Sequence, residues 1–196
     1  MTQLSVIITT CNRANDLKQT LMSLLQQNTN GFFTFDVIVA DNNSKDHTKE
    51  VIQDLMPHFK GKLQYIFESQ QGKTHAINKL IKLCKSEIIV STDDDVLIAP
   101  DWLLNIVECF QTYNCDVVGG RVLPQYPQDT PQWVKDNADL LSGPIVKYDY
   151  GETIKPYCKP MYEFLGANIA YKRSLFEEYG FYRTDLGPGT GITGDD

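Results

Sequence analysis

The sequence has no apolar run long enough to cross a lipid bilayer. Stretches such as Leu4–Ile8 fall far short of the about 20 residues that a membrane-spanning helix requires. No basic segment precedes the first apolar run, so the layout of a signal peptide is also missing. We therefore expect a cytoplasmic protein, either free in solution or peripheral at a membrane surface.

Positive charge is scarce as well. The 196 residues include 18 Lys and Arg against 25 Asp and Glu, which gives a formal net charge of −7. A surface with this balance repels phosphate backbones and argues against nonspecific nucleic-acid binding. The chain is 42% hydrophobic, which is enough to build a core and excludes a disordered tail, a collagen-like fibre or a coiled coil. Its length fits one domain.

The cysteine spacing of a disulfide-rich or zinc-binding protein is also missing. The five cysteines are odd in number, irregularly spaced and form no C-x-x-C pair; they are Cys11, Cys84, Cys109, Cys115 and Cys158. This pattern indicates neither a disulfide framework nor a structural zinc site. We expect reduced cysteines that pack as small hydrophobic residues.

Motifs that mark several other α/β enzymes are missing too. No G-x-G-x-x-G follows the first β-branched run, which argues against a dinucleotide-binding Rossmann site. The sequence contains neither G-x-x-x-x-G-K-[ST] nor G-x-S-x-G, so it predicts neither a P-loop nucleoside triphosphatase nor an α/β-hydrolase.

What is present is an alternation of strand-like and helix-like segments. Short β-branched runs predict strands at Leu4–Thr10, Phe35–Ala40, Leu63–Phe67, Glu87–Ser91 and Asp116–Gly120. Apolar residues at helical spacing lie between them, around Leu17–Leu25, Thr48–Met56, Ile77–Cys84 and Asp101–Tyr113. This alternation predicts an α/β fold with a mostly parallel sheet covered by helices on both faces.

The second half of the chain is less regular. Residues 121–164 are rich in Pro, Gly and Tyr, with a short helix expected near Gln132–Leu140. Regular structure is expected again at Leu165–Tyr171 and in a helix over Arg173–Tyr179. We expect this half to shape a substrate pocket. Trp133 lies here, either stacking on a sugar or packing in the core, whereas Trp102 is expected to pack its helix onto the sheet.

Polar residues follow four of the predicted strands. They are Thr9–Arg13, Asp41–Ser44, Gln71–Lys73 and Thr92–Asp95. The carboxyl ends of parallel strands meet at one edge of a sheet, where ligands bind. Arg13 and Lys73 could meet phosphate charge there or remain solvated. The Asp41 segment could read a base or ribose, or simply form a turn and a helix cap.

Asp93, Asp94 and Asp95 are the sharpest feature of the sequence. Adjacent carboxylates at the end of a buried strand repel one another unless a cation neutralises them or one is protonated. Mg²⁺ or Mn²⁺ suits oxygen ligands and typically leaves coordination positions for substrate phosphates. The alternative is a solvated acidic turn. A calcium loop is disfavoured because its D-x-D-x-D-G spacing is absent.

Taken in chain order, these motifs resemble those of the family 2 glycosyltransferases, which have the GT-A fold. The matching segments are SVIITTCNR with Ser23–Gln27 behind it, Val39–Ser44, Gly72–Lys73 with Asn78, Asp93–Asp95 before Pro100–Leu103, Gly166–Asn168, Tyr179–Phe181 and Gly194–Asp196. They cover essentially the whole chain.

The resemblance implies a Rossmann-like nucleotide-diphospho-sugar transferase fold in a single domain, 1–196. Residues 1–120 would bind the nucleotide sugar and residues 121–196 would face the acceptor. The donor would be held by residues at the strand tips, with Asp41 on the base and Asp93 near the ribose. These donor-binding residues are Thr9, Thr10, Cys11, Asn12, Arg13, Asp41, Asn43, Gly72, Lys73, Asp93 and Asp94.

The resemblance also assigns a metal ligand and a base. Asp95 would ligate Mn²⁺ or Mg²⁺ as the last position of a D-x-D motif, with Asp94 as the rival ligand. Gly194–Asp196 is similar to the family's Gly-Glu-Asp, which makes Asp196 the expected catalytic base and Asp195 its rival. The chain ends at this motif, where the family's chains continue, so we expect a C-terminal truncation that binds donor but transfers sugar poorly.

The implied activity is a metal-dependent, inverting transfer of sugar from a nucleoside-diphosphate sugar, expected to be UDP-linked. The acceptor would be the hydroxyl of a glycan, lipid-linked or other molecule, in polysaccharide or glycoconjugate synthesis. One base without a second nucleophile points to inversion. Two alternatives remain: a fragment that binds nucleotide and metal but is impaired in catalysis, and a sugar-phosphate nucleotidyltransferase. The latter class carries a Gly-rich loop that the Thr9–Arg13 segment lacks.

Overall fold

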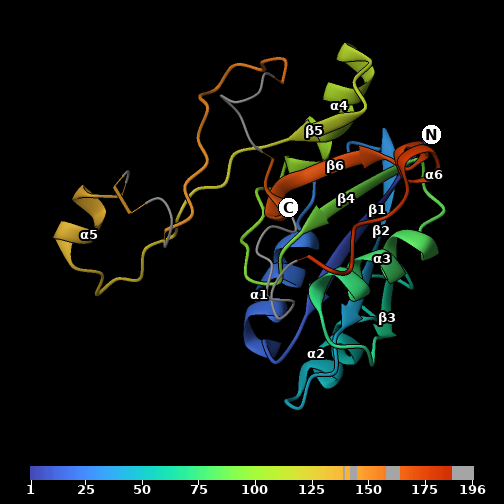
Figure 1. The fold of residues 1–196 in the computed structure, drawn as a ribbon, viewed down its shortest axis with the longest axis horizontal. Coiled ribbons are helices and arrows are strands. Elements are labelled where there is room, and N and C mark those ends of the chain that lie inside the picture. Colours follow the sequence, from blue (N-terminus) through green and yellow to red (C-terminus); the bar gives the residue numbers. More distant parts are fainter. Residues whose placement is uncertain (139, 142–144, 158–163, 187–196) are drawn as a thin grey trace.

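A mostly parallel sheet forms the centre of the protein (Figure 1). The computed structural model describes residues 1–138, 140–141, 145–157 and 164–186. Within them the sheet has six strands in the order β3-β2-β1-β4-β6-β5. Their bounds are β1 Thr2–Thr10, β2 Phe33–Asp41, β3 Leu63–Phe67, β4 Ile88–Thr92, β5 Val117–Gly119 and β6 Ile169–Lys172. Strands β1 to β4 run parallel, and β6 runs antiparallel to both β4 and β5.

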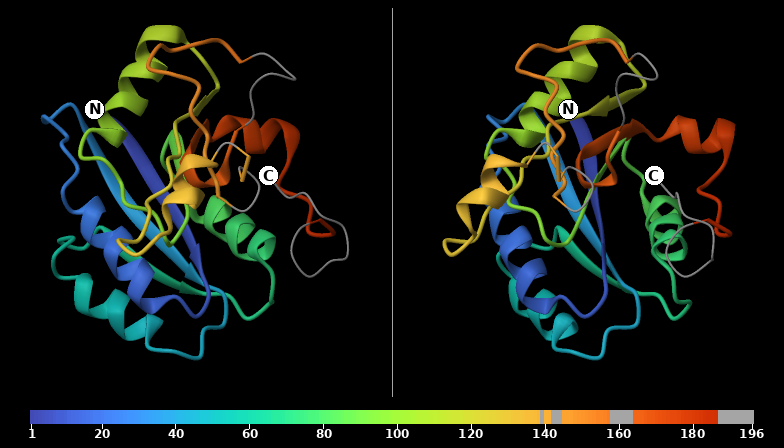
Figure 2. Two further views of the ribbon diagram at one scale, coloured as in Figure 1. Left: turned by 90° about the vertical axis from the view of Figure 1, so that its left-hand side faces the viewer. Right: turned by 60° about the vertical axis from the view of Figure 1, so that its left-hand side comes forward.

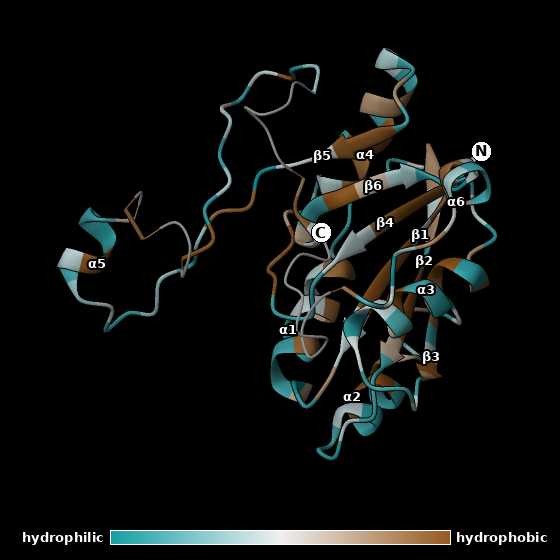
Figure 3. Cartoon of the chain, viewed as in Figure 1, coloured by the Kyte–Doolittle hydropathy of each residue, from teal (hydrophilic) through white to brown (hydrophobic). Residues whose placement is uncertain are grey.

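Helices cover both faces of this sheet, as the alternation predicts (Figure 2). Helices α1 (Ala14–Leu24), α2 (Thr48–Leu55) and α4 (Trp102–Tyr113) pack on one face. Helix α3 (Lys73–Leu83) packs on the other face, with α6 (Ser174–Tyr179) beside it. Side chains alternate along β1, so Val6 and Ile8 join the first core while Ile7 joins the second. Hydrophobic residues accordingly concentrate on the central strands (Figure 3).

The strand order creates a crevice between β1 and β4. After β1 the chain moves outward through β2 and β3, then crosses back to place β4 on the other side of β1. Such a switch point leaves the carboxyl ends of the two strands free of a crossing connection and is where open α/β sheets bind ligands. The segments after Thr10 and after Thr92 both lead into this crevice.

The second half departs from two of our expectations. The helix predicted near Gln132–Leu140 is the shorter α5, Gln132–Asp136, because Asn137 leaves the helical conformation with φ of −113° and ψ of 23°. The Asn137 side chain donates to the Trp133 carbonyl at 2.7 Å. The segment predicted as regular from Leu165 begins with a 3₁₀ turn, Gly166–Asn168, ahead of β6. The segment around α5 extends away from the sheet (Figure 1).

Both tryptophan predictions have an outcome. Trp102 packs against the first core as expected, and its indole nitrogen donates to Asn168 Oδ1 at 2.8 Å. Trp133 is 63% exposed, so the core-packing alternative is wrong and stacking on a sugar stays a prediction.

Cys84 and Cys109 are buried free thiols, as expected, whereas Cys158 lies outside the described residues. In the part of the chain that the structure describes, no helix is both long and apolar enough to span a membrane.

Asp46 fixes the starts of two helices beside the crevice. Its Oδ2 accepts a hydrogen bond from the Ala14 backbone N–H of α1 at 3.0 Å. Its Oδ1 accepts from the backbone N–H and the hydroxyl of Thr48, the first residue of α2. Desolvation acts to raise the pKa of Asp46, but these hydrogen bonds outweigh it and leave the pKa below its ordinary value.

We predict that Asp46→Ala lowers the free energy of unfolding by about 1–2 kcal/mol at neutral pH, because each helix loses a cap. The depressed pKa means that the contribution is present above the unfolded-state pKa and is lost as the pH falls through the folded-state pKa. Urea unfolding should therefore show the wild type and the variant converging on acidification. The control is Asp54→Ala on exposed α2 surface, expected to stay within about 0.5 kcal/mol of wild type. Equal stability of Asp46→Ala and wild type at neutral pH would contradict the capping role.

Candidate functional site

A cavity of about 330 Å³ lies at the switch point, at the carboxyl ends of β1 and β4. Its lining combines both strand tips with the start of α3: Thr9, Thr10, Cys11, Arg13, Asn42, Lys73, Asp93, Asp94 and Asp95. Residues predicted from distant parts of the sequence thus meet in one place. Asn12, Asp41, Asn43 and Gly72 were also predicted for the site but do not line this cavity.

The acidic triplet divides into buried and exposed members. The Asp94 side chain is 9% exposed, whereas the Asp95 side chain is 50% exposed. The Arg13 guanidinium hydrogen-bonds Asp95 Oδ2 and lies 3.7 Å from Asp94 Oδ1. On the other side, Lys73 Nζ lies 3.2 Å from Asp93 Oδ1. The solvated-turn alternative is therefore wrong for Asp94, and both predicted phosphate-binding cations face carboxylates.

Burial makes the charge of Asp94 costly. Desolvation raises the pKa of Asp94 above its ordinary value, although the Thr10 hydroxyl and the Arg13 guanidinium act in the opposite direction. The same pairing, with Asp94 as the largest contributor, raises the pKa of Arg13 further. A positive charge at this point of the cavity therefore favours the ionised form of Asp94.

These residues fit a divalent cation. Asp94 and Asp95 already converge on one positive group, the Arg13 guanidinium. The buried Thr10 hydroxyl makes no hydrogen bond of good geometry among the described residues, although it lies near enough to Asp94 to lower the pKa of that carboxyl. Those residues contain no group of three or more His, Cys, Asp and Glu side chains able to hold a metal ion. Mg²⁺ and Mn²⁺ sites commonly use one or two carboxylates completed by water and substrate phosphate, which is what this pair can offer.

Thr20 positions the loop that contains Asp93–Asp95, a role that was not predicted from the sequence. Its hydroxyl is fully buried and lies 2.9 Å from the carbonyl oxygens of both Asp94 and Val96. The same oxygen accepts from the Val96 N–H at 3.1 Å. The available signal was a polar residue on the buried face of α1, among leucines at helical spacing.

Asp41 is held by two neighbours. Its Oδ1 accepts from the Ser44 backbone N–H at 2.8 Å, and its Oδ2 accepts from the Tyr65 hydroxyl at 2.9 Å. Desolvation and the bond to Asp41 raise the pKa of Tyr65 to about 12. The segment bends after β2, as the turn alternative expects, but the helix-cap part of that alternative is wrong, because Asp46 rather than Asp41–Ser44 bonds the start of α2. A contact between Asp41 and a nucleotide base stays a prediction.

Asn12 and Asn43 shape the two turns beside the cavity. Both have positive φ, at 55° and 65°, a conformation that asparagine tolerates better than most residues. The Asn12 backbone N–H donates to Ser44 Oγ, and its Oδ1 accepts from the Lys45 N–H at 2.6 Å. These contacts join the tip of β1 to the tip of β2, which explains asparagine at positions that do not line the cavity.

Asn42 ties the β2 tip to the loop that precedes α3. Its side-chain amide donates to the Glu68 carbonyl at 3.2 Å and the Gln70 carbonyl at 2.7 Å, and its Oδ1 accepts from the Gly72 N–H at 2.8 Å. Gly72 has φ of +128°, which L side chains rarely adopt. Asn42 therefore sets the position from which α3 presents Lys73.

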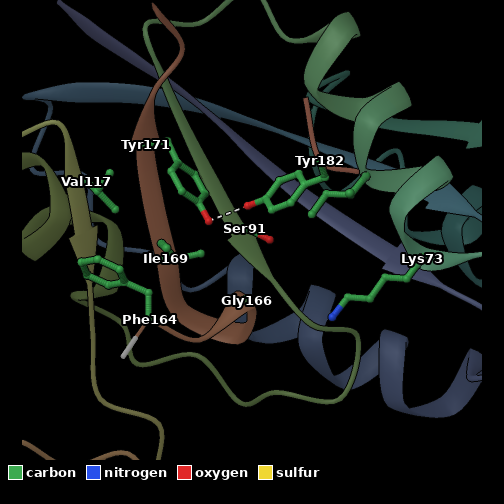
Figure 4. Close-up of a pocket in the computed structure, with 9 residues that line it drawn as sticks. Lys73, Ser91, Val117, Phe164, Gly166, Ile169, Tyr171 and Tyr182 are labelled. Atoms are coloured by element: carbon green, nitrogen blue, oxygen red, sulfur yellow. Dashed lines mark hydrogen bonds between the residues drawn. The ribbon is translucent and has the colours of Figure 1, made fainter. Parts of the chain in front are cut away.

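A second cavity of about 270 Å³ adjoins the first and shares Lys73 with it (Figure 4). Residues near and within β6 supply one side, including Phe164, Ile169 and Tyr171. The hydroxyls of Tyr171 and Tyr182 point toward each other and lie 2.6 Å apart. The second half of the chain thus reaches the same end of the sheet. The predicted base Asp196 and its rival Asp195 lie outside the described residues.

Comparison with known proteins identifies the family. The profile described as "Glycosyl transferase family 2" matches residues 5–180. The chain belongs to glycosyltransferase family 2. The predicted family and fold class are therefore confirmed.

Two curated relatives show how far the likeness extends. The glucosyl-dolichyl phosphate glucuronosyltransferase of Haloferax volcanii is 25% identical over 193 residues, covering 94% of this chain and 57% of its own length. An uncharacterised glycosyltransferase of a Nostoc species is 25% identical over 185 residues, covering 90% of this chain and 52% of its own. The chain spans about half the length of both relatives.

Solved structures share the same architecture. The mannosyltransferase PcManGT of Pyrobaculum calidifontis, in complex with GDP-Man and Mn²⁺, has a TM-score of 0.65 and 25% identity. The likeness covers 94% of this chain and 48% of that one. Residues 1–349 of S. aureus TarS give a TM-score of 0.73 at 18% identity, covering 97% of this chain and 52% of that one. The latter likeness supports the fold alone.

For this family 2 glycosyltransferase we predict that Asn42→Ala lowers the free energy of unfolding by about 1–3 kcal/mol, because it removes three part-buried hydrogen bonds to the loop before α3. Hydrogen exchange of the Gly72 amide should accelerate, since that N–H loses its acceptor. Asn105→Ala on the exposed surface of α4 is the matched control and should change neither quantity. Unchanged exchange at Gly72 would show that Asn42 does not hold this loop.

Proposed function

We propose that the protein transfers a sugar from a nucleoside-diphosphate sugar to an acceptor hydroxyl, with a divalent metal ion and inversion at the anomeric carbon. The observation that carries the proposal is one cavity at the switch point that brings together Asp94, Asp95, Arg13 and Lys73. Two carboxylates suit a cation, and two cations suit the phosphates of the donor. Family membership favours sugar transfer over the nucleotidyltransferase alternative.

Each residue has a separate role in this proposal. Asp95 and Asp94 hold Mn²⁺ or Mg²⁺, which when bound supplies positive charge to the leaving diphosphate. The Arg13 guanidinium and Lys73 ammonium bind phosphate oxygens from either side of the acidic triplet. Thr9, Thr10, Cys11 and Asp93 shape the donor pocket around them. Asp41 would contact the base by exchanging its bond from Tyr65 for one from the nucleotide.

The reaction needs one proton acceptor. The acceptor hydroxyl oxygen attacks the anomeric carbon while the bond from that carbon to the diphosphate oxygen breaks, and a carboxylate takes the hydroxyl proton. We assign this role to Asp196, with Asp195 as the alternative. Residues 1–120 would bind the donor and residues 121–196 would face the acceptor. The second cavity supports this division, because Phe164, Ile169 and Tyr171 line it beside Lys73.

The donor nucleotide is expected to be uridine-based, and the GDP-Man complex of PcManGT makes guanosine the competing choice. The acceptor class is a glycan, lipid-linked or other hydroxyl, as in the dolichyl phosphate relative. A thermal-shift screen of UDP-, GDP- and dTDP-sugars with and without Mn²⁺ tests the donor nucleotide and the metal dependence, since a bound ligand raises the melting temperature. Metal-dependent stabilisation by one nucleotide class supports the proposal, and stabilisation by none contradicts it.

We predict that Asp95→Asn weakens donor binding in Mn²⁺ by about tenfold to a hundredfold, or about 1.4–2.8 kcal/mol, because the metal loses a charged ligand. Calorimetry with the selected nucleotide and Mn²⁺ measures the change. Asp149→Asn removes an exposed carboxylate that is likewise paired with an arginine, Arg121, and should bind donor as wild type does. Equal donor affinity in Asp95→Asn and wild type would remove Asp95 from the site.

We predict that Asp196→Asn slows sugar transfer by about a hundredfold or more while donor affinity stays within about twofold, because a general base acts in the chemical step. Transfer is followed by release of nucleoside diphosphate in the presence of acceptor. Asp195→Asn should have the smaller effect. If Asp195→Asn abolishes transfer and Asp196→Asn does not, the two assignments are exchanged; if neither variant slows transfer, the base lies elsewhere.

A further inference from the structure

Arg13 combines a fixed backbone with a long, half-exposed side chain. The residue precedes α1, and its carbonyl oxygen accepts from the Leu17 N–H at 2.9 Å, which anchors the main chain. Its side chain is 51% exposed and reaches across the crevice to the loop after β4. The guanidinium can therefore move between neighbouring partners without any change in the fold.

The present partners of this guanidinium are the proposed metal ligands. It hydrogen-bonds Asp95 Oδ2 and lies 3.7 Å from Asp94 Oδ1, while Asp16 on α1 adds a further favourable charge. Lys73 faces the remaining member of the triplet, Asp93, at 3.2 Å. Arg13 thus supplies positive charge at the place where Asp94 and Asp95 converge.

A divalent ion and the guanidinium compete for the same oxygens. Two positive groups on one carboxylate pair repel each other strongly in a partly buried site. A diphosphate changes this balance, because its oxygens offer the guanidinium a bidentate partner of equal or higher charge within the same cavity. Arg13 can then leave the carboxylates without losing an ionic partner.

We propose that Arg13 is an internal counter-ion whose exchange from Asp94 and Asp95 to the donor diphosphate makes metal ion and nucleotide bind cooperatively. This inference rests on the proposed function and adds a coupling between its two ligands. The guanidinium weakens binding of the metal alone and strengthens binding of the metal together with a diphosphate. By linkage, the metal raises nucleotide affinity by the same factor by which the nucleotide raises metal affinity.

The test measures binding rather than turnover. Free Mn²⁺ is titrated by its electron paramagnetic resonance signal against wild type and Arg13→Gln, each with and without UDP or GDP, whichever the screen selects. Without nucleotide, Arg13→Gln should bind Mn²⁺ about twofold to fivefold more tightly, the range expected when a half-exposed ion pair is removed. Without metal, the same variant should bind the nucleotide more weakly. The factor by which each ligand raises the affinity for the other should be smaller in Arg13→Gln than in wild type.

Two further variants serve as controls. Arg121→Gln removes the same charge from an exposed arginine that is also paired with a carboxylate, Asp149. It should leave Mn²⁺ affinity unchanged, which separates the local effect from net charge. Arg13→Lys keeps a positive charge at the site and should retain most of the suppression of metal binding. Circular dichroism confirms that each variant is folded before titration.

The outcomes separate this inference from the proposed function. If wild type binds nucleotide in a Mn²⁺-dependent way but Arg13→Gln binds Mn²⁺ alone no more tightly, the counter-ion exchange is wrong and the metal site stands. If Mn²⁺ does not enhance nucleotide binding in wild type, the metal-dependent function and the exchange both fail. Tighter binding of Mn²⁺ by Arg13→Gln, together with a smaller mutual enhancement, supports the exchange.

Discussion

Three consecutive carboxylates after a buried strand impose the constraint on which this site depends. Asp94 is 6% exposed, and burial raises its pKa, so its ionised form needs a nearby positive charge. Arg13, at the tip of β1, supplies that charge, and Lys73, at the start of α3, faces the neighbouring Asp93. The negative charge of the carboxylates, which pairs with these two side chains, also makes the cavity suitable for a metal cation. A bound cation would in turn favour binding of an anion such as a diphosphate.

The scaffold fixes the carboxylates, whereas the two basic groups that pair with them lie at the ends of longer side chains. Thr20 holds the backbone on both sides of Asp95, and Asn42 fixes the loop before α3 through three hydrogen bonds. Asp46 defines where α1 and α2 begin. Arg13 and Lys73 by contrast project from these rigid starts on long side chains. Fixed carboxylates beside long basic side chains suit a negatively charged ligand that binds together with a cation.

The mostly parallel sheet could be predicted from the sequence, and so could the convergence of the polar segments that follow its strands, because both follow from local patterns. β-Branched runs predict β1 to β5, and the parallel pairing of β1 with β4 brings Arg13 beside Asp95. Contacts that depend on register were not predictable. Tyr65 reaches Asp41 only because β3 pairs with β2 in one particular register. Asn42 and Thr20 also bond to segments distant in sequence. The length of α5 was overestimated because helical spacing does not reveal that Asn137 leaves the helical conformation.

The proposed site requires Asp94 and Asp95 to bind a divalent ion against the diphosphate of a sugar donor. The decisive measurement is a crystal structure of the protein soaked with Mn²⁺ and a nucleoside diphosphate, with anomalous scattering to locate the metal. We expect manganese bound between these carboxylates and the phosphate oxygens, with the Arg13 guanidinium on the diphosphate. Nucleotide bound elsewhere, or metal-free carboxylates still bonded to Arg13, would contradict it.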